Sequence, residues 1–188
     1  MLNVHHIVHQ TTAEGPGVRC GIWLQGCRIH CKGCFAKDMW SFSERLLMNP
    51  NDIINQIYLT EEGLTICGGE PFEQKEELAE LMCLAWEKGL STVLYSGHTY
   101  ESLLEMHDDY VTTILSHTDI LIDGPFILSM LSTENPLVGS NNQQLRFLTK
   151  RYSPDDIKRN KLEIRVKKNG VLSINGMADY DSIRKITI

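Results

Sequence analysis

Three cysteines lie close together near the start of the chain. Cys27, Cys31 and Cys34 fall within the segment GCRIHCKGCF (26–35), with three and then two residues between them. Thiolates bind zinc and iron–sulfur clusters, and both kinds of site are normally closed by four protein ligands. This segment supplies only three thiolates. Its spacing therefore predicts either a site completed from elsewhere in the chain or a cluster with one iron open to a small molecule.

The candidates for a fourth ligand each have a simpler explanation. His30 is the local choice for zinc, but its position beside Cys31 makes joint coordination awkward. The other cysteines, which are Cys20, Cys67 and Cys83, suit buried strand and helix positions, because a free cysteine behaves as a small hydrophobe. We therefore favour the open iron. A non-enzymatic iron–sulfur or zinc protein with Cys20 or Cys67 as the fourth ligand stays as an alternative.

A glycine motif follows the cysteines. The segment CGGEPF (67–72) ends an apolar, strand-like run with Gly68 and Gly69. Neither glycine has a β-carbon, so their backbone can approach a ligand closely. Glu70 adds a negative charge beside that turn.

The elements that would position these motifs alternate in type. Strand-like runs that end at glycine cover residues 19–26, 63–69, 91–97 and 118–124, and helical patterns cover 49–61 and 73–89. This alternation predicts an α/β protein with a parallel sheet. The loops after the strands would then meet at one edge of the sheet, bringing together the cysteine loop, Gly68-Gly69, Ser96-Gly97 and Asp123-Gly124.

The C-terminal segment has a different pattern. Residues 161–176 alternate around Asn169-Gly170, which predicts a β-hairpin. Residues 1–145 contain 7 Lys and Arg against 19 Asp and Glu, whereas residues 146–188 contain 11 against 5. We therefore expect a core domain over 1–154 and a basic hairpin extension of that domain over 155–188. Such a basic segment is either a solvated basic face or a surface that docks an anionic partner.

Composition limits the class of protein. At 188 residues and 42% hydrophobic content, the chain suits one globular domain. It contains no apolar run near the ~20 residues that span a bilayer, and its start does not resemble a secretory signal. A cytoplasmic protein with no membrane partner is expected. His5, His6 and His9 are interpreted as part of a polar N-terminus.

The motifs together resemble those of the radical S-adenosylmethionine (SAM) superfamily, in which the three cysteines hold a 4Fe-4S cluster and the fourth iron binds SAM. Within it, the chain is similar to the activating proteins of anaerobic ribonucleotide reductase and to the pyruvate formate-lyase activating enzymes. Gly33, just before the third cysteine, favours the first group. The similarity rests on EGPGVRC (14–20), GCRIHCKGCFAKDMW (26–40), YSGHTYESL (95–103), ILIDGPF (120–126) and GSNNQQL (139–145).

The resemblance implies a partial (βα) barrel and an activity. One electron reaches SAM through the cluster, the products are methionine and a 5′-deoxyadenosyl radical, and the radical takes an α-hydrogen from a glycine of the partner. The implied partners are a large glycyl-radical enzyme and a flavodoxin- or ferredoxin-like electron donor. The alternative is a radical SAM enzyme that modifies a small molecule, a peptide or RNA, for which the basic tail is the best argument.

The resemblance also implies site residues. Cys27, Cys31 and Cys34 are the expected cluster ligands, and Gly68, Gly69 and Glu70 are expected to hold the methionine end of SAM. Ser96 and Gly97 are predicted to contact its carboxylate or ribose, and Phe35 to shield the cluster or contact adenine. The residues expected on the side of the substrate or partner are Asp123, Asn141 and Gln143.

Overall fold

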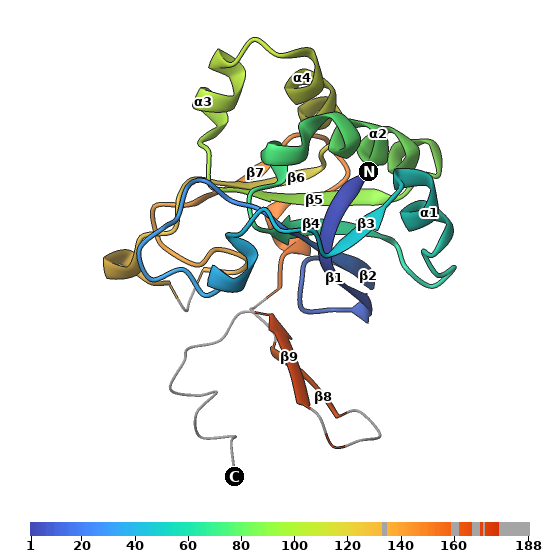
Figure 1. Cartoon of the computed structure of the whole chain (residues 1–188), viewed down its shortest axis with the longest axis horizontal. Coiled ribbons are helices and arrows are strands. Elements are labelled where there is room, and N and C mark those ends of the chain that lie inside the picture. The colour runs from blue at the N-terminus through green and yellow to red at the C-terminus, as the bar shows by residue number, and fades with distance from the viewer. Residues whose placement is uncertain (133–134, 159–161, 167–169, 171, 177–188) are drawn as a thin grey trace.

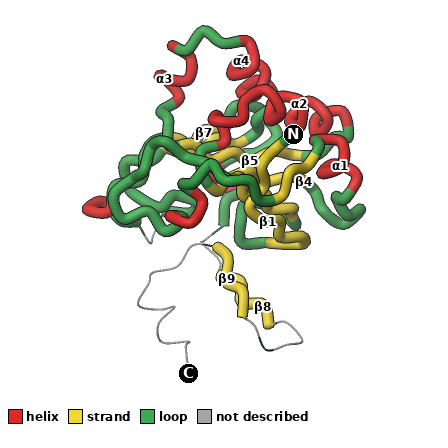
Figure 2. The backbone as a smooth tube through the Cα atoms, viewed as in Figure 1, coloured by secondary structure: helices red, strands yellow, loops and turns green. Residues whose placement is uncertain are grey.

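A seven-stranded sheet forms the body of the protein, and helices cover one of its faces (Figure 1). The computed structural model describes residues 1–132, 135–158, 162–166, 170 and 172–176. The strand order in the sheet is β3-β1-β2-β4-β5-β6-β7. The tube view shows the strands of this sheet as one layer with the helices α1 to α4 above it, and β8 and β9 below and apart from that layer (Figure 2).

Four consecutive strands of this sheet are parallel, as the sequence predicts. They are β2 (Arg19–Leu24), β4 (Gly63–Gly68), β5 (Ser91–Ser96) and β6 (Ile120–Asp123). Leu24 pairs with Gly68 at the end of β2, and Ser96 pairs with Asp123 at the end of β5. The loops that carry the cysteine and glycine motifs therefore leave the same edge of the sheet, which confirms the predicted arrangement.

The predicted parallel strands form the centre of a mixed sheet, which three antiparallel strands complete. These are β1 (Leu2–Thr11), β3 (Leu46–Met48) and β7 (Gln144–Phe147). The N-terminal residues were interpreted as an ordinary polar segment. They instead form the antiparallel strand β1, so that interpretation is wrong. An antiparallel strand can keep one face partly exposed, so the histidines of β1 are compatible with a strand in which Leu2 and Val4 are buried.

The helices are α1 (Pro50–Asn55), α2 (Lys75–Glu87), α3 (Tyr100–Glu105) and α4 (Asp109–Ser116). Short 3₁₀ turns cover Lys37–Met39, Pro71–Gln74, Leu128–Met130 and Pro154–Asp156. The helix α1 is shorter than the predicted 49–61. The Tyr58 amide donates to Glu61 (2.8 Å), so the last residues of that range form a loop around a buried carboxylate.

Both faces of the sheet are buried. Toward the helices, Ile22, Leu24 and Ile66 pack with helix residues such as Leu81 and Ile114 in one core cluster. On the opposite face lies a smaller cluster, which comprises Val93, Ile120, Ile122, Leu137 and Val138. Near-continuous burial of these strands explains why they appear in the sequence as apolar runs rather than as alternating patterns.

The C-terminal strands β8 (Leu162–Val166) and β9 (Leu172–Gly176) pair antiparallel, although Asn169 of the predicted hairpin turn lies outside the described residues. Glu163 accepts from the Thr12 amide (2.7 Å), and Arg165 donates to the carbonyl oxygens of His9 and Gln10. The charge of Arg165 therefore helps to hold the strand pair on the body of the chain.

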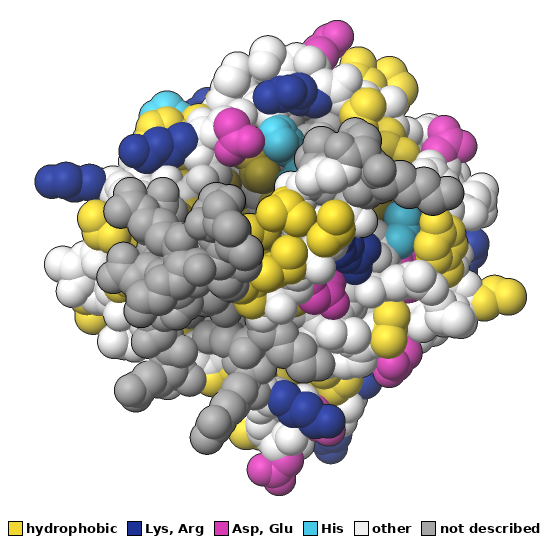
Figure 3. Space-filling model, turned by 90° about the horizontal axis from the view of Figure 1, so that it is seen from below, with side chains coloured by type: hydrophobic (Ala, Val, Ile, Leu, Met, Phe, Trp, Pro, Cys, Tyr) yellow, Lys and Arg dark blue, Asp and Glu magenta, His cyan; other side chains and the backbone are white. Residues whose placement is uncertain are grey.

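Figure 3 views the molecule from below. Basic and acidic side chains are interspersed over the part of this face that the structure describes, so the charge segregation in the sequence produces no single-sign patch there. The domain boundary at residue 154 and the docking role of the basic tail stay predictions. None of the helices described is long and apolar enough to span a bilayer.

Candidate functional site

The cysteine loop leaves the carboxyl end of β2 and is closed at its base by hydrogen bonds. The Gly26 amide donates to the Met39 carbonyl (2.8 Å), and the Cys27 amide donates to the Trp40 carbonyl (3.2 Å). The Gln25 side chain donates to the carbonyl of Ser41 (2.5 Å). Residues 27–39 therefore form a loop that is anchored at its base, and the part that carries the three thiols, 27–34, has no helix or strand of its own.

Backbone amides point at the cysteine sulfurs. The Ala36 amide donates to Cys34 Sγ (3.4 Å). Burial raises the pKa of the Cys27 thiol, and amides of His30 and Ile29 oppose that rise. Burial likewise raises the pKa of the Cys31 thiol, and the Phe126 amide opposes it. Hydrogen bonds to sulfur are a feature that tunes iron–sulfur sites, so this donor set fits a cluster bound through thiolates.

The cysteine loop does not have the geometry of a site for a single ion. Within the described ranges, His9, Cys20 and Glu61 are the only trio of His, Cys, Asp or Glu side chains whose ligand atoms all lie within 4.8 Å of one another. The loop sulfurs are thus spread around a larger volume. This arrangement favours a cluster over zinc.

Cys20 is too far from this loop to act as a fourth ligand. Cys20 lies near the start of β2, and four residues of extended chain, about 13 Å, separate it from Leu24 at the strand's end. Burial raises the pKa of the Cys20 thiol to about 12, and the Glu61 carboxylate adds to the rise. Burial raises the pKa of the Cys67 thiol well above its usual value, and the Glu14 carboxylate adds to the rise.

Gly68 and Gly69 are pressed against the end of β2. Gly68 has a φ of +109°, and a β-carbon there would lie 2.4 Å from the Leu24 nitrogen. A β-carbon on Gly69 would lie 2.2 Å from the Gly26 carbonyl oxygen. The Gly69 amide also donates to the Leu24 carbonyl (2.8 Å). The chain itself therefore requires both glycines, in addition to any ligand that approaches them.

Glu70 links the glycine turn to the end of β5. Its carboxylate is 1% exposed and accepts from the Phe72 amide (3.1 Å), the Ser96 hydroxyl (3.0 Å) and the Gly97 amide (2.8 Å). Burial raises the pKa of Glu70, and these hydrogen bonds oppose the rise. The carboxylate is thus directed into the protein, and the polar groups predicted at Ser96 and Gly97 are held by it.

The cysteine loop also reaches the end of β5. A β-carbon on Gly97 would lie 2.5 Å from Ile29 Cδ1, which comes from the cysteine loop. The Ser96 hydroxyl, which donates to Glu70, accepts from the His98 amide (3.0 Å). Three loops that are distant in sequence therefore pack against one another at a single edge of the sheet.

The residues expected on the partner side are engaged in structural contacts. Asp123 is 2% exposed and accepts from the Tyr100 amide (2.8 Å) and from Arg146 Nε (2.7 Å). Gln143 accepts from the Gly139 amide (2.8 Å) and donates to the carbonyl of residue 124 (3.0 Å). These side chains shape the loops beside the site.

Asn141 lies on the exposed surface of the same region, where its side-chain oxygen accepts from the Asn135 amide group (3.1 Å). Its predicted role toward a partner therefore stays a prediction.

Sequence reasoning missed the contribution of the segment after β6. Burial raises the pKa of the Cys31 thiol and the Phe126 amide lowers it, and the Phe126 ring meets Phe35 edge-on with centroids 5.7 Å apart. Phe35 itself is 65% exposed. A β-carbon on Gly33 would lie 2.8 Å from Leu128, so this segment also restricts the cysteine loop sterically. The available signal was the Gly-Pro-Phe run that directly follows a predicted strand end.

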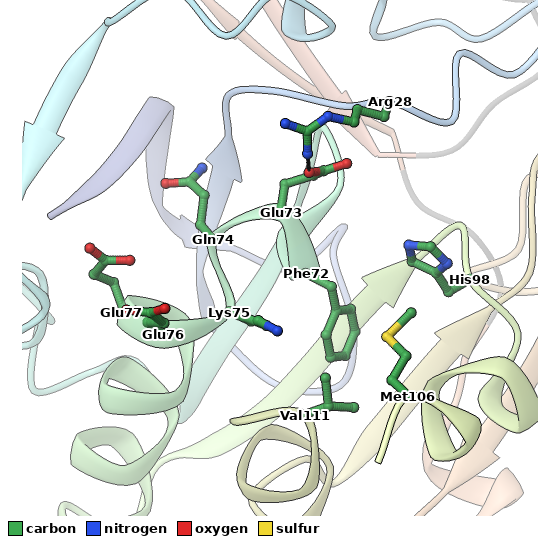
Figure 4. Close-up of a pocket in the computed structure, with 10 residues that line it drawn as sticks. All are labelled: Arg28, Phe72, Glu73, Gln74, Lys75, Glu76, Glu77, His98, Met106 and Val111. Atoms are coloured by element: carbon green, nitrogen blue, oxygen red, sulfur yellow. Dashed lines mark hydrogen bonds and ion pairs between the residues drawn. The ribbon is translucent and has the colours of Figure 1, made fainter. Parts of the chain in front are cut away.

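A cavity of about 440 Å³ lies beside the cysteine loop (Figure 4). One residue of the cysteine loop, Arg28, lines the cavity and is ion-paired with Glu73. The lining also includes Phe72 from the 3₁₀ turn, His98 after β5 and Met106 at the end of α3. None of the predicted cluster ligands lines this cavity, so it is separate from the thiol site.

Taken together, these features define an α/β iron–sulfur protein whose thiol loop leaves the end of a parallel strand beside a glycine turn. Residues 13–146 match the family described as "4Fe-4S single cluster domain". The chain belongs to this family, and within it to the radical SAM proteins that activate glycyl-radical enzymes.

Relatives with assigned names support that placement. The chain is 28% identical over 158 residues to the anaerobic ribonucleoside-triphosphate reductase-activating protein of Vibrio cholerae, covering 79% of this chain and 99% of the relative. It is 30% identical over 140 residues to the protein of the same name from Haemophilus influenzae, covering 69% and 88%. With the pyruvate formate-lyase-activating enzyme of Clostridium pasteurianum it shares 28% over 130 residues, covering 63% and 54%.

Proposed function

We propose that this protein is a radical SAM activating enzyme that generates a glycyl radical on an anaerobic ribonucleotide reductase. The observation that carries this proposal is the cysteine loop, in which amides point at the sulfurs at the edge of the sheet that also holds the glycine turn. The choice of partner rests on how much of each relative's length this chain covers. The Vibrio cholerae relative is matched over 99% of its chain, whereas the Clostridium pasteurianum enzyme is matched over 54%.

Cys27, Cys31 and Cys34 would hold one 4Fe-4S cluster and leave one iron for SAM. When both cofactors are bound, one electron from a flavodoxin- or ferredoxin-like donor cleaves SAM to methionine and a 5′-deoxyadenosyl radical, which takes one hydrogen atom from a partner glycine and becomes 5′-deoxyadenosine. The chain contributes the thiolates and the amides that stabilise them.

The glycine turn and the end of β5 would receive the methionine part of SAM. Glu70 acts here as a positioning residue, because its buried carboxylate fixes Ser96 and Gly97 relative to Gly69. The sheet would serve as a partial barrel, with the face opposite the helices directed toward the radical. At the carboxyl half of that face lie Trp23, Cys67 and Tyr95.

The test of this function is a radical transfer. Reconstituted protein, SAM, a one-electron reductant and the partner reductase are expected to give a persistent organic radical. Its electron spin resonance doublet should collapse to a single line when the partner glycine carries deuterium at the α-carbon. Omission of SAM is the control. If 5′-deoxyadenosine instead forms in step with modification of a metabolite, a peptide or RNA, the activator function is wrong and the alternative replaces it.

Changing Glu70 is expected to weaken SAM binding without loss of the cluster. In Glu70→Gln, one carboxylate oxygen becomes an NH₂ group, so one of the three bound donors loses its acceptor. The loss of one buried hydrogen bond, ~1.4 kcal/mol, corresponds to about a tenfold weaker affinity for SAM. Titration of the cluster-loaded protein with SAM measures the effect.

Glu76→Gln is the matched control, because Glu76 is an exposed acid of α2. It should leave SAM affinity unchanged. An unaltered affinity in Glu70→Gln, at unchanged iron content and unfolding temperature, would remove the positioning role.

A further inference from the structure

A second group of metal-binding side chains lies away from the cysteine loop. His9 comes from β1, Cys20 from the start of β2, and Glu61 from the loop before β4. Their ligand atoms all lie within 4.8 Å of one another. Because Cys20 is near the start of β2 and the cysteine loop follows its end, the group lies toward the opposite edge of the sheet.

The distances within this group suit a single ion. His9 Nδ1 lies 3.2 Å from Glu61 Oε1 and 3.3 Å from Glu61 Oε2. Two ligands each about 2.0 Å from a tetrahedral zinc ion are separated by about 3.3 Å along the edge of the tetrahedron. The nitrogen and oxygen are therefore already one tetrahedral edge apart, with the Cys20 sulfur nearby.

The surrounding contacts hold the three side chains in place. Glu61 accepts from the amides of Gln10 (2.6 Å) and Tyr58 (2.8 Å), which fixes its carboxylate. The His9 ring stacks on the Tyr58 ring, with centroids 4.4 Å apart and an interplanar angle of 20°. Metal ligands in proteins are typically oriented by outer contacts of this kind.

Of the three side chains, His9 alone is partly exposed to solvent. The Glu61 side chain and Cys20 are fully buried, whereas the His9 side chain is 24% exposed. A cation can enter beside His9, and a water molecule can complete its coordination from the same side. A set of one nitrogen, one sulfur and one oxygen ligand suits zinc, while calcium and magnesium require oxygen ligands.

We propose that His9, Cys20 and Glu61 bind one Zn²⁺ ion in an open site of three protein ligands, with water as the fourth ligand. The ion would join β1, β2 and the loop before β4. Binding releases the thiol proton of Cys20, because the thiolate is the ligand. The simpler arrangement is an ion pair between His9 and Glu61, in which Cys20 is only a neighbour. The zinc site requires the Cys20 sulfur as a ligand, whereas the ion pair does not involve it.

The test uses anaerobically reconstituted, cluster-loaded protein. It is incubated with Zn²⁺, exchanged into metal-free buffer, and analysed for zinc and iron by mass spectrometry. About one zinc per chain is expected beside the irons. Cys20→Ala and His9→Phe should each lower zinc affinity at least about tenfold with iron unchanged. His9→Phe keeps an aromatic ring to stack on Tyr58.

Cys83→Ala is the matched control, because it removes a different free cysteine, on α2. It should retain the zinc. Co²⁺ provides a second readout, since a thiolate-to-cobalt absorption band should appear in the parent protein and be absent in Cys20→Ala. Substoichiometric zinc in the parent protein, or equal zinc in Cys20→Ala, would overturn the site and leave the ion pair. Neither result bears on the radical activity, which depends on other cysteines.

Discussion

Replacement of Cys27, Cys31 or Cys34 by alanine is expected to abolish the iron–sulfur cluster and every product that depends on SAM. Each sulfur is one of only three proposed ligands, and Cys20 lies toward the other end of β2, too far away to substitute for one of them. We expect about four irons per chain in the parent protein and nearly none in each variant. Iron content, visible absorption and the yield of 5′-deoxyadenosine measure the loss.

The other cysteines supply the controls for that experiment. Cys20→Ala and Cys83→Ala should retain the irons and the production of 5′-deoxyadenosine, although Cys20→Ala should lose the zinc. In Cys20→Ala, the iron content reports on the cluster and the zinc content reports on the second proposed metal site. Loss of the cluster in Cys20→Ala, in a protein that remains folded, would show that the cluster has a fourth thiolate.

The sequence predicted the central part of the fold because its signals are local. Each parallel strand is a short apolar run that ends at glycine, and both features are visible without knowledge of distant neighbours. Since the strands are parallel, their ends had to meet at one edge. Glu70, Ser96 and Gly97 do meet there, as their hydrogen bonds show.

The features that the sequence did not predict depend on contacts between distant segments. The strand β1 contains three histidines and is recognised as a strand only through its pairing with β2. The carboxylate of Glu70, whose role toward SAM stays a prediction, accepts hydrogen bonds from donors 26 and 27 residues away. The amide of Phe126 reaches Cys31 across the sheet edge. No spacing rule encodes such contacts.

The segment EGPGVR (14–19) shows how a motif of the family can serve the fold. Gly15 and Gly17 have φ values of +137° and +75°, and these conformations let the chain turn before β2. The turn places the Pro16 carbonyl where it accepts from Arg19 (3.0 Å). The motif thus builds the amino end of the sheet.

Arg19→Met is expected to lower the free energy of unfolding by about 3–5 kcal/mol, the cost of removing one member of a buried polar network. The Arg19 side chain is fully buried and donates to Thr65 Oγ1 (2.8 Å), to Ser91 Oγ (2.9 Å) and to the carbonyl groups of Pro16, Leu64 and Ser91. Methionine fills similar space but supplies no donor. Thermal unfolding should show a midpoint lower by about 10 °C for a chain of this size.

Two further variants separate the hydrogen bonds from the charge and from the substitution itself. Arg19→Lys keeps a charge but carries a compact ammonium in place of the planar guanidinium, so an intermediate loss is expected. Arg45→Met makes the same change at an exposed position and should cost less than about 0.5 kcal/mol. If Arg19→Met were no less stable than Arg45→Met, the five hydrogen bonds would contribute little net stability. The glycine turn before β2 would then need another explanation, because Arg19 is the residue that it positions.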